Sequence, residues 1–406
     1  MSGYIPNPSD IDKGRIASCK RKHIGTLSLA CILLSSLFVA GQNVFPAASD
    51  DVLAITNSTS STTPKAAATE DGDNIYVTWQ EDGEIYIIKT TDGGASFSNT
   101  INISNSTTAA SINPQIAVSG SDNVLVVWEE AGDIFLARSI DAGDNFAVTN
   151  ASNDVEASTN PQRAVSESDE VYIVWEGLTD NDDSEIFLIK TTDGGASFGN
   201  TTNISNSTTA TSTNPQIAVS GSDNVLVVWE EAGDIFLSVS TTSGSSFEVD
   251  NLSQSPDEDS IDADIHSVGS DVLATWQEYD ANASLSRMVY KVSADNGQLF
   301  TENPTTLITS DDLFITPSIG SGTAGFFVIW EQFDTAQSEG SIYVSIANED
   351  LELSCPAEIG DTNDNSAHPN LASDGAGGLF SVWEELVHEG EGQKVIFAYG
   401  FDATAP

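Results

Sequence analysis

The stretch NPQIAVSGSDNVLVVWEEAGDIFL occupies Asn113–Leu136 and returns letter for letter at Asn214–Leu237. Its apolar runs are short, rich in β-branched residues and separated by Gly, Asp and Asn, which predicts strands joined by tight turns. A third run of the same kind, ending in Trp175, lies between the two copies. The stretch therefore predicts an all-β repeat protein in which a pair of units has been duplicated.

The tryptophans mark the repeat unit, because each one ends a strand-like run such as LVVW. Successive tryptophans are about 50 residues apart, a period typical of propellers and other repeat arrays. One unit contains four expected strands: Asn113–Ser119, Asn123–Glu130, Asp133–Ser139 and a fourth near Phe146–Ala151. The 7 tryptophans are Trp79, Trp128, Trp175, Trp229, Trp276, Trp330 and Trp383.

The two ends of the repeat region complement each other. Val52–Ser61 is similar to the fourth strand of a unit, whereas the last unit stops after its third strand, Lys394–Phe401. Closure of a propeller removes open sheet edges. We therefore expect a seven-bladed β-propeller of four-stranded blades over residues 52–401, closed by the N-terminal strand and followed by a short tail, 402–406.

A second repeated phrase, KTTDGGASF, fills the turn after the third strand at Lys89–Phe97 and at Lys190–Phe198. Its pattern is [ST]-x-D-x-G-x-x-F, in which the hydroxyl and carboxylate can bind the backbone of their own turn. A copy without the aspartate lies at Thr241–Phe247. The intact copies contain Asp92, Asp141, Asp193 and Asp295.

This pattern resembles the Asp box of the BNR-repeat, sialidase-like propellers. The resemblance covers about Val52 to Phe401. It implies that the four aspartates are structural and lie on the face opposite an active site.

The N-terminal segment has the features of a targeting signal. Lys20, Arg21, Lys22 and His23 precede the uncharged apolar run Ile24–Gly41. Residues 1–41 are therefore expected to be a signal peptide, followed by a linker, 42–51, although the run is also long enough for an uncleaved anchor. Either case predicts a secreted or cell-surface protein. Cleavage would leave Cys355 without a partner for an intrachain disulfide.

The net charge of −48 limits the kinds of partner that the protein can bind. Such a surface repels nucleic acid and anionic membranes, so we expect glycans or extracellular proteins, with a membrane contact only if the leader is uncleaved. In an exported chain, N-x-S/T triplets are candidates for surface glycosylation. These triplets begin at Asn57, Asn102, Asn105, Asn150, Asn200, Asn203, Asn206, Asn251 and Asn282.

The resemblance implies that sialidase activity must be considered. In that family, three arginines bind the carboxylate of the substrate. After the leader this chain has only Arg138, Arg163 and Arg287. Of these, only Arg163 falls on an expected innermost strand, so the triad cannot be assembled. We therefore predict a non-catalytic binding module for glycans or surface proteins. The alternative is an exo-α-sialidase-like or related glycoside hydrolase. A glycosidase that uses two carboxylates is also open, because acidic residues are abundant.

One face collects the candidate binding residues, because the residues after each tryptophan and the starts of the innermost strands meet there. It can be a ligand or Ca²⁺ surface, or a solvated acidic rim. The tryptophans themselves are expected to pack between blades rather than to stack on sugars. The ligand-binding candidates are Arg163, Gln162, Gln115, Gln216, Asp264, Asn370, Glu129, Glu176 and Glu230, and the Ca²⁺ candidates are Asp180, Asp182 and Asp361.

Arg163 breaks a pattern, since the other six units have an apolar residue in its slot. A buried arginine is costly without a partner. We therefore expect it to pair with a carboxylate that reaches in from a neighbouring blade; the nearest candidates in sequence are Glu176 and the Asp180–Asp183 loop. The pair would lock two blades together, or Arg163 would be an anion-binding point.

Overall fold

The structure is a computed structural model that describes residues 52–399, except positions 57, 59, 121, 154–155, 180–182, 209, 256–257, 282–283, 323–324, 335–338, 349, 360–364, 374–378 and 388–391. Its described part consists of strands and turns and contains no helix that could cross a membrane. The expected leader, linker and tail lie outside the described residues, as do Asp180, Asp182 and Asp361.

The strands form seven four-stranded antiparallel sheets. Sheet 1 is β2 (Thr62–Ala68), β3 (Ile75–Glu81), β4 (Glu84–Thr90) and β5 (Ile101–Asn102). Sheet 2 is β6 (Ser111–Val118), β7 (Val124–Glu130), β8 (Asp133–Ser139) and β9 (Ala147–Asn150). Sheet 3 is β10 (Ser158–Val165), β11 (Val171–Leu178), β12 (Ser184–Thr191) and β13 (Thr202–Asn203). Sheet 4 is β14 (Ser212–Val219), β15 (Val225–Glu231), β16 (Asp234–Ser240) and β17 (Glu248–Asn251).

The remaining sheets follow the same order. Sheet 5 is β18 (Asp259–Val268), β19 (Asp271–Asp280), β20 (Leu285–Ser293) and β21 (Thr305–Ser310). Sheet 6 is β22 (Leu313–Gly322), β23 (Gly325–Asp334), β24 (Glu339–Ile346) and β25 (Ala357–Glu358). Sheet 7 is β26 (Asn365–Ser373), β27 (Leu379–Val387), β28 (Gly392–Tyr399) and β1 (Val52–Ala54).

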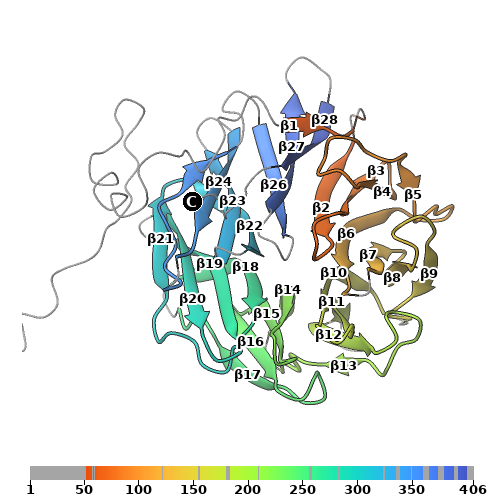
Figure 1. Ribbon diagram of the computed structural model, residues 1–406. Coiled ribbons are helices and arrows are strands. Elements are labelled where there is room, and N and C mark those ends of the chain that lie inside the picture. Colours follow the sequence, from red (N-terminus) through yellow and green to blue (C-terminus); the bar gives the residue numbers. More distant parts are fainter. Residues whose placement is uncertain are drawn as a thin grey trace, which may run out of the picture.

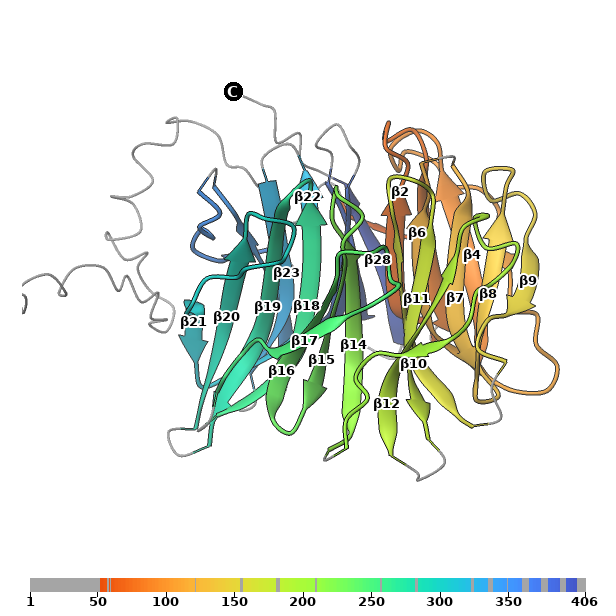
Figure 2. The same ribbon diagram turned by 90° about the horizontal axis from the view of Figure 1, so that it is seen from below.

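The sheets stand around a central axis as the blades of a propeller, with the first strand of each sheet innermost (Figures 1 and 2). Each innermost strand contacts the innermost strand of the next sheet, and β26 contacts β2, so the ring is closed. The predicted class, an all-β propeller of four-stranded blades, is confirmed.

The N-terminal strand completes the last sheet, as the ends of the repeat region predicted. β1 pairs antiparallel with β28 through Val52–Ala398, Leu53–Phe397 and Ala54–Ile396. It occupies the outer position that β5 or β9 fills in earlier sheets. The first and last strands of the described chain are therefore held together by a backbone ladder.

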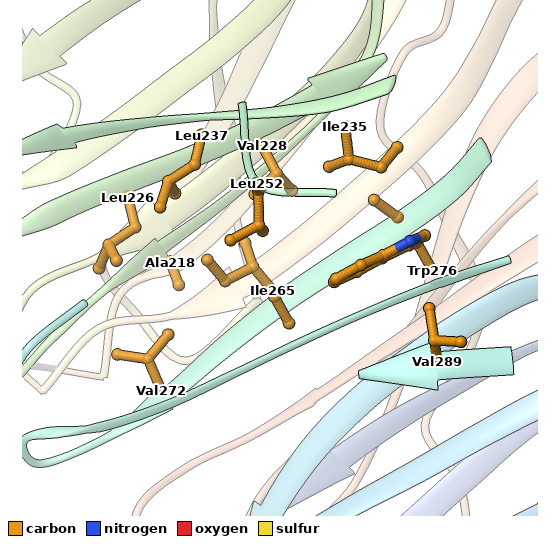
Figure 3. Close-up of a cluster of buried hydrophobic side chains, with 12 residues drawn as sticks. Ala218, Leu226, Val228, Ile235, Leu237, Leu252, Ile265, Val272, Trp276 and Val289 are labelled. Atoms are coloured by element: carbon orange, nitrogen blue, oxygen red, sulfur yellow. The ribbon is translucent and has the colours of Figure 1, made fainter. Parts of the chain in front are cut away.

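The core lies between neighbouring sheets. In one cluster, Leu226 and Leu237 of sheet 4 pack with Ile265 and Trp276 of sheet 5 (Figure 3). All seven tryptophans are at most 2% exposed, which confirms that they pack in the core. Five of them stack on an aromatic residue of the next strand: Tyr86, Phe135, Phe187, Phe236 or Tyr343.

A carboxylate two residues after the tryptophan satisfies the buried indole N–H in most sheets. In sheet 2, Glu130 Oε2 accepts from Trp128 Nε1 at 3.1 Å and from Ser111 Oγ at 2.8 Å. In sheet 3 the equivalent position is Gly177, and there the indole nitrogen of Trp175 and the hydroxyl of Ser158 are buried without a partner among the residues that the structure describes. The Trp-x-Glu pattern thus has a structural cause.

The turns after the third strands lie at the sheet end opposite to the tryptophans, since Thr90 pairs with Ile75 at the start of β3. In one of them, Asp141 Oδ1 accepts from Asn145 N at 2.9 Å and from Ser139 Oγ at 2.8 Å. Asp92, Asp193 and Asp295 make equivalent bonds within their own turns. These carboxylates stabilise their own loops, which is the role that the resemblance implied.

Candidate binding site in the central channel

Every innermost strand contains a bulge near its start. The register with the second strand shifts there in all seven sheets. One residue of each bulge has a left-handed backbone, with φ between 46° and 54°: Thr63, Asn113, Asn160, Asn214, Asp262, Thr316 and His368. Asparagine and aspartate tolerate this conformation, whereas the two threonines store strain of about 1–3 kcal/mol each. Bulges re-aim side chains, here toward the propeller axis.

The bulges surround a central cavity of about 440 Å³. The slot two residues after each left-handed residue also lines this cavity: Lys65, Gln115, Gln162, Gln216, Asp264, Ser318 and Asn370. Arg163 lines it as well. The structure thus brings six of the predicted binding residues to one place.

The predicted candidates Glu129, Glu176 and Glu230 join neighbouring sheets. Glu176 Oε1 in sheet 3 accepts from the backbone N–H of Asn214 in sheet 4 at 2.7 Å, and Glu230 Oε1 accepts from the N–H of Asp262 in sheet 5 at 2.8 Å. Glu129 is hydrogen-bonded in the same way to the N–H of Asn160. We call these bonds inter-sheet latches, because each satisfies the N–H that a bulge removes from its own ladder.

Two further latches lie at the seams of sheet 7. Glu331 Oε2 accepts from His368 N at 3.3 Å, and Glu384 Oε1 accepts from Thr63 N at 2.5 Å. Burial raises the pKa of the Glu129, Glu230 and Glu331 carboxyls. The repeated glutamate after the tryptophan therefore closes the ring of sheets.

Lys65 and Arg163 are the cations of the channel. Arg163 Nε donates to the Ile116 carbonyl of the neighbouring sheet at 2.6 Å. Within the described residues, no carboxylate oxygen lies within the 4.0 Å ion-pair distance of either cation. Three other bases have such partners, whereas Arg138 and Lys291 have none among the described residues: Lys89 pairs with Asp144, Lys190 with Glu170, and Arg287 with Glu258 and Glu278.

The predicted pairing of Arg163 with Glu176 is wrong. Glu176 Oε1 is taken by the N–H of Asn214 and by the amide of Asn160, both at 2.7 Å. Most of the alternative loop, Asp180–Asp182, lies outside the described residues. The carboxylate serves a backbone N–H instead, since the bulge leaves that donor without a ladder partner.

The two channel cations influence each other. Burial, followed by the charge of Arg163, lowers the pKa of the Lys65 ammonium to about 8. Burial also lowers the pKa of the Arg163 guanidinium to about 10, against the attraction of Asp264. An anion in the channel would offset both effects.

The seven slots divide into two kinds. Asp264 accepts from Ile265 N at 2.8 Å and from Ile319 N at 2.7 Å, and Asn370 Oδ1 accepts from Ala66 N at 3.0 Å. These polar side chains are occupied by the fold. The amides of Gln115, Gln162 and Gln216, by contrast, make no hydrogen bond to any part of the chain that the structure describes. Among these seven slots, the polar side chains without a hydrogen bond to the described chain thus come from sheets 1 to 4.

Two histidines complete the lining. His266 Nε2 lies 3.0 Å from Ser321 Oγ, and burial lowers its pKa to about 4. His368 Nδ1 lies 3.0 Å from Glu384 Oε1, and this contact raises the pKa of His368. Among the described residues there is no cluster of three or more His, Cys, Asp or Glu side chains that could hold a metal ion.

Sequence reasoning missed the ring of bulges. A signal was present, because a proline follows the left-handed residue in six of the seven innermost strands, for example in Asn113–Pro114. Proline inside a strand-like run marks an edge or a bulge. Reading those prolines as bulges would have predicted that the residues around them face the axis.

No family model matches the chain, and no curated protein matches it. Solved structures are similar in fold. An ulvan lyase of a polysaccharide lyase family, bound to -[GlcA(1-4)Rha3S]-, is 11% identical with a TM-score of 0.60, covering 86% of this chain and 95% of its own. A protein of unknown function from Dyadobacter fermentans is 11% identical with a TM-score of 0.54, covering 86% of this chain and 97% of its own.

An α-L-arabinofuranosidase from Fusarium graminearum, in complex with an iminosugar inhibitor, is 11% identical with a TM-score of 0.50. The match covers 74% of this chain and 98% of the arabinofuranosidase. At these identities the likeness shows the fold alone. Many of the similar propellers are glycan-acting enzymes.

Proposed function

We propose that this protein is a non-catalytic binding module that holds an anionic group of a glycan in its central channel. The observation that carries the proposal is the pair Lys65 and Arg163, two cations that face the cavity without a carboxylate partner among the described residues. A carboxylate or sulfate between them would offset their mutual repulsion, and the guanidinium can bind such a group through two N–H donors.

The neighbouring amides support a sugar as the carrier of the anion. Gln115, Gln162 and Gln216 each offer one acceptor and two donors on adjacent sheets, and sugar hydroxyls use both kinds of group. A cavity of about 440 Å³ falls in the range of small-molecule sites. The saccharide in the ulvan lyase structure contains glucuronate, so acidic saccharides are the first ligands to test.

The state of the carboxylates favours binding over hydrolysis. A two-carboxylate glycosidase needs one acid and one base or nucleophile that reach the substrate. Asp264 is held by two backbone N–H groups, and Glu176, Glu230, Glu331 and Glu384 act as inter-sheet latches. These five carboxylates are therefore held by the fold. Asp262 also lines the channel, and its carboxylate makes no hydrogen bond to the described chain.

The remaining sequence expectations form part of this proposal. Membership of the Asp-box propellers is supported by the turn bonds of Asp92, Asp141, Asp193 and Asp295. Export through the N-terminal segment, glycosylation at the N-x-S/T triplets and a Ca²⁺ role for Asp180, Asp182 and Asp361 stay proposals, tested by N-terminal sequencing, glycopeptide mass spectrometry and calcium titration of the native protein.

Calorimetric titration with matched oligosaccharides tests the binding function. The ligands would be oligosaccharides with glucuronate or sulfate, and the same backbones without charge. We expect binding of the charged set only, weakened at least tenfold in the double variant Lys65→Met/Arg163→Met. The control Lys89→Met/Lys190→Met removes the same two charges elsewhere and should bind like wild type.

Unchanged binding in the channel variant would overturn the proposed site, and absence of binding by every charged ligand would overturn the proposed function. Release of product from a panel of fluorogenic glycosides by the wild-type protein would favour the hydrolase alternative instead.

A further inference from the structure

A second cavity, of about 360 Å³, opens at the seam between sheets 4 and 5. Its lining comes from the start of β14, the β15–β16 hairpin, the start of β18, β19, and Leu313 at the start of β22. The polar members that matter here are Glu230, Glu231, Asp259, Gln277 and Tyr279. Lys65 and Arg163 do not line it, so this seam cleft is separate from the channel.

Two of its carboxylates are occupied by the fold. Glu231 accepts from Ser207 and Ser212 and from the indole of Trp229. Glu230 Oε1 is an inter-sheet latch to Asp262 N. The acidic character of the cleft alone therefore indicates no ligand.

Three other groups are unoccupied. Gln277 is 2% exposed, and its Oε1 accepts from Phe314 N at 2.8 Å, which orients the amide; its Nε2 has no partner among the described residues. The Asp259 carboxylate and the Tyr279 hydroxyl likewise make no hydrogen bond to the described chain. The cleft thus offers a buried donor, a free acceptor and an aromatic ring with a hydroxyl.

The internal duplication provides a built-in comparison. Sheets 2 and 4 share the stretch Asn113–Leu136, so Glu129-Glu130-Ala131-Gly132 repeats Glu230-Glu231-Ala232-Gly233. The facing strands differ. Ser158 N bonds to Gly132 O, and Ser260 N bonds to Gly233 O, both at 2.8 Å, which puts the two seams in the same register.

In that register, Ala157 of sheet 3 is equivalent to Asp259 of sheet 5, and Leu178 of sheet 3 is equivalent to Tyr279 of sheet 5. Gly233 has φ +84°, and a Cβ there would lie 3.1 Å from Asp259 Oδ1, so the glycine leaves room for the carboxylate. The carboxylate and the phenol that distinguish the cleft therefore come from sheet 5, whereas the hairpin Glu230–Gly233 recurs in sheet 2. Thr211 and Thr213 of the lining also differ, since sheet 2 has Ala110 and Ile112 at these positions.

We propose that the seam cleft binds a neutral saccharide unit. A sugar hydroxyl donates and accepts, which matches Asp259 as acceptor, Gln277 Nε2 as donor and Tyr279 as both. An anion is disfavoured by three carboxylates without a Lys, Arg or His among the lining residues. An ammonium ion is also disfavoured, because its N–H groups would face the N–H donor Gln277 Nε2. The volume lies near the lower end of small-molecule sites, about 300–1,000 Å³.

Saturation-transfer NMR and titration with neutral methyl glycosides test this site. The matched variant is Asp259→Ala/Tyr279→Leu, which gives the seam the residues that sheet 3 has at these two positions and leaves Gln277 in place. We expect binding to weaken at least tenfold in this variant while the melting temperature stays within a few degrees. Lys65→Met/Arg163→Met should leave binding at the seam unchanged, which separates this site from the channel.

Three results would overturn the proposal. The first is absence of binding by every neutral glycoside. The second is unchanged binding in Asp259→Ala/Tyr279→Leu. The third is preferential binding of N-acetyl-lysine methylamide with steep salt dependence, which would make the cleft a cation site.

Discussion

His368 Nδ1 lies 3.0 Å from Oε1 of Glu384, the oxygen that also accepts from the backbone N–H of Thr63. One buried carboxylate thus serves an imidazole of its own sheet and the bulge of sheet 1. This contact sits at the seam where the last sheet meets the first, beside the channel mouth.

The pH dependence of stability should report this contact. The bond to Glu384 raises the pKa of His368 in the folded protein, although burial, Glu331 and Lys65 also act on it. A raised folded pKa means that the contribution is fully present below the unfolded value, about 6.5, and is lost as pH rises through the folded pKa. As pH rises through that range, the melting temperature of the wild-type protein should therefore fall relative to that of His368→Asn.

Asparagine is the matched replacement, because Asn113, Asn160 and Asn214 occupy the same left-handed position in other sheets. The effect is small, below about 1 kcal/mol, since the His368 side chain is 47% exposed. A pH profile of His368→Asn parallel to that of wild type would contradict this assignment.

Removal of the Glu384 carboxyl should weaken the ring closure. Glu384→Ala leaves the N–H of Thr63 without its acceptor, and such a buried donor costs about 1–3 kcal/mol of unfolding free energy. Glu384→Gln keeps an acceptor oxygen and should cost less. Urea denaturation of the two variants measures the difference, and equal destabilisation would show that the latch oxygen is not the important group.

Two tryptophans in equivalent slots should respond differently to removal of the indole nitrogen. Trp128 donates to Glu130, whereas the Trp175 nitrogen is buried with no partner in the described part of the chain. Trp128→Phe should therefore be more destabilising than Trp175→Phe, by about 1 kcal/mol, the usual net value of one hydrogen bond. Trp128→Ala should cost about 3–5 kcal/mol. Calorimetric unfolding gives the comparison, and a reversed order would refute it.

Loss of β1 should open a sheet edge. Deletion of Val52–Ala54 removes the strand that pairs with β28, and exposed edges promote association between chains. We expect a lower melting temperature and aggregation that increases with protein concentration, measured by light scattering. A monomeric deletion variant with the wild-type melting temperature would show that β1 is dispensable.

Anion binding in the channel should decline in alkaline solution. The pKa of Lys65 is lowered to about 8, first by burial and then by Arg163. Because a lysine loses its charge above its pKa, affinity for an acidic oligosaccharide should fall as pH rises through this value. Lys65→Met should bind weakly at all pH values, with a flat profile between about pH 7 and pH 9. An equally steep decline in that variant would assign the titration to another group.

The sequence by itself determined the propeller and its closing strand. A Trp-centred unit of about 50 residues specifies short strands, and local turn chemistry around residues such as Asp141 and Gly143 joins them. These are properties of contiguous residues, so the amino-acid pattern contains them. The two ends, Val52–Ala54 and Gly392–Tyr399, could also be matched, because each end resembles part of a unit.

Only the tertiary structure decided which polar groups are free. Glu176 and Gln162 look equally available in the sequence, yet Glu176 is held by Asn214 of the next sheet, and Gln162 has no partner in the described chain. Neighbouring innermost strands are about 50 residues apart, and their bulges create backbone donors that a local pattern does not contain. The partners at each seam are therefore a property of how sheets meet, as the identical stretches at Glu129 and Glu230 show when they face Ala157 and Asp259.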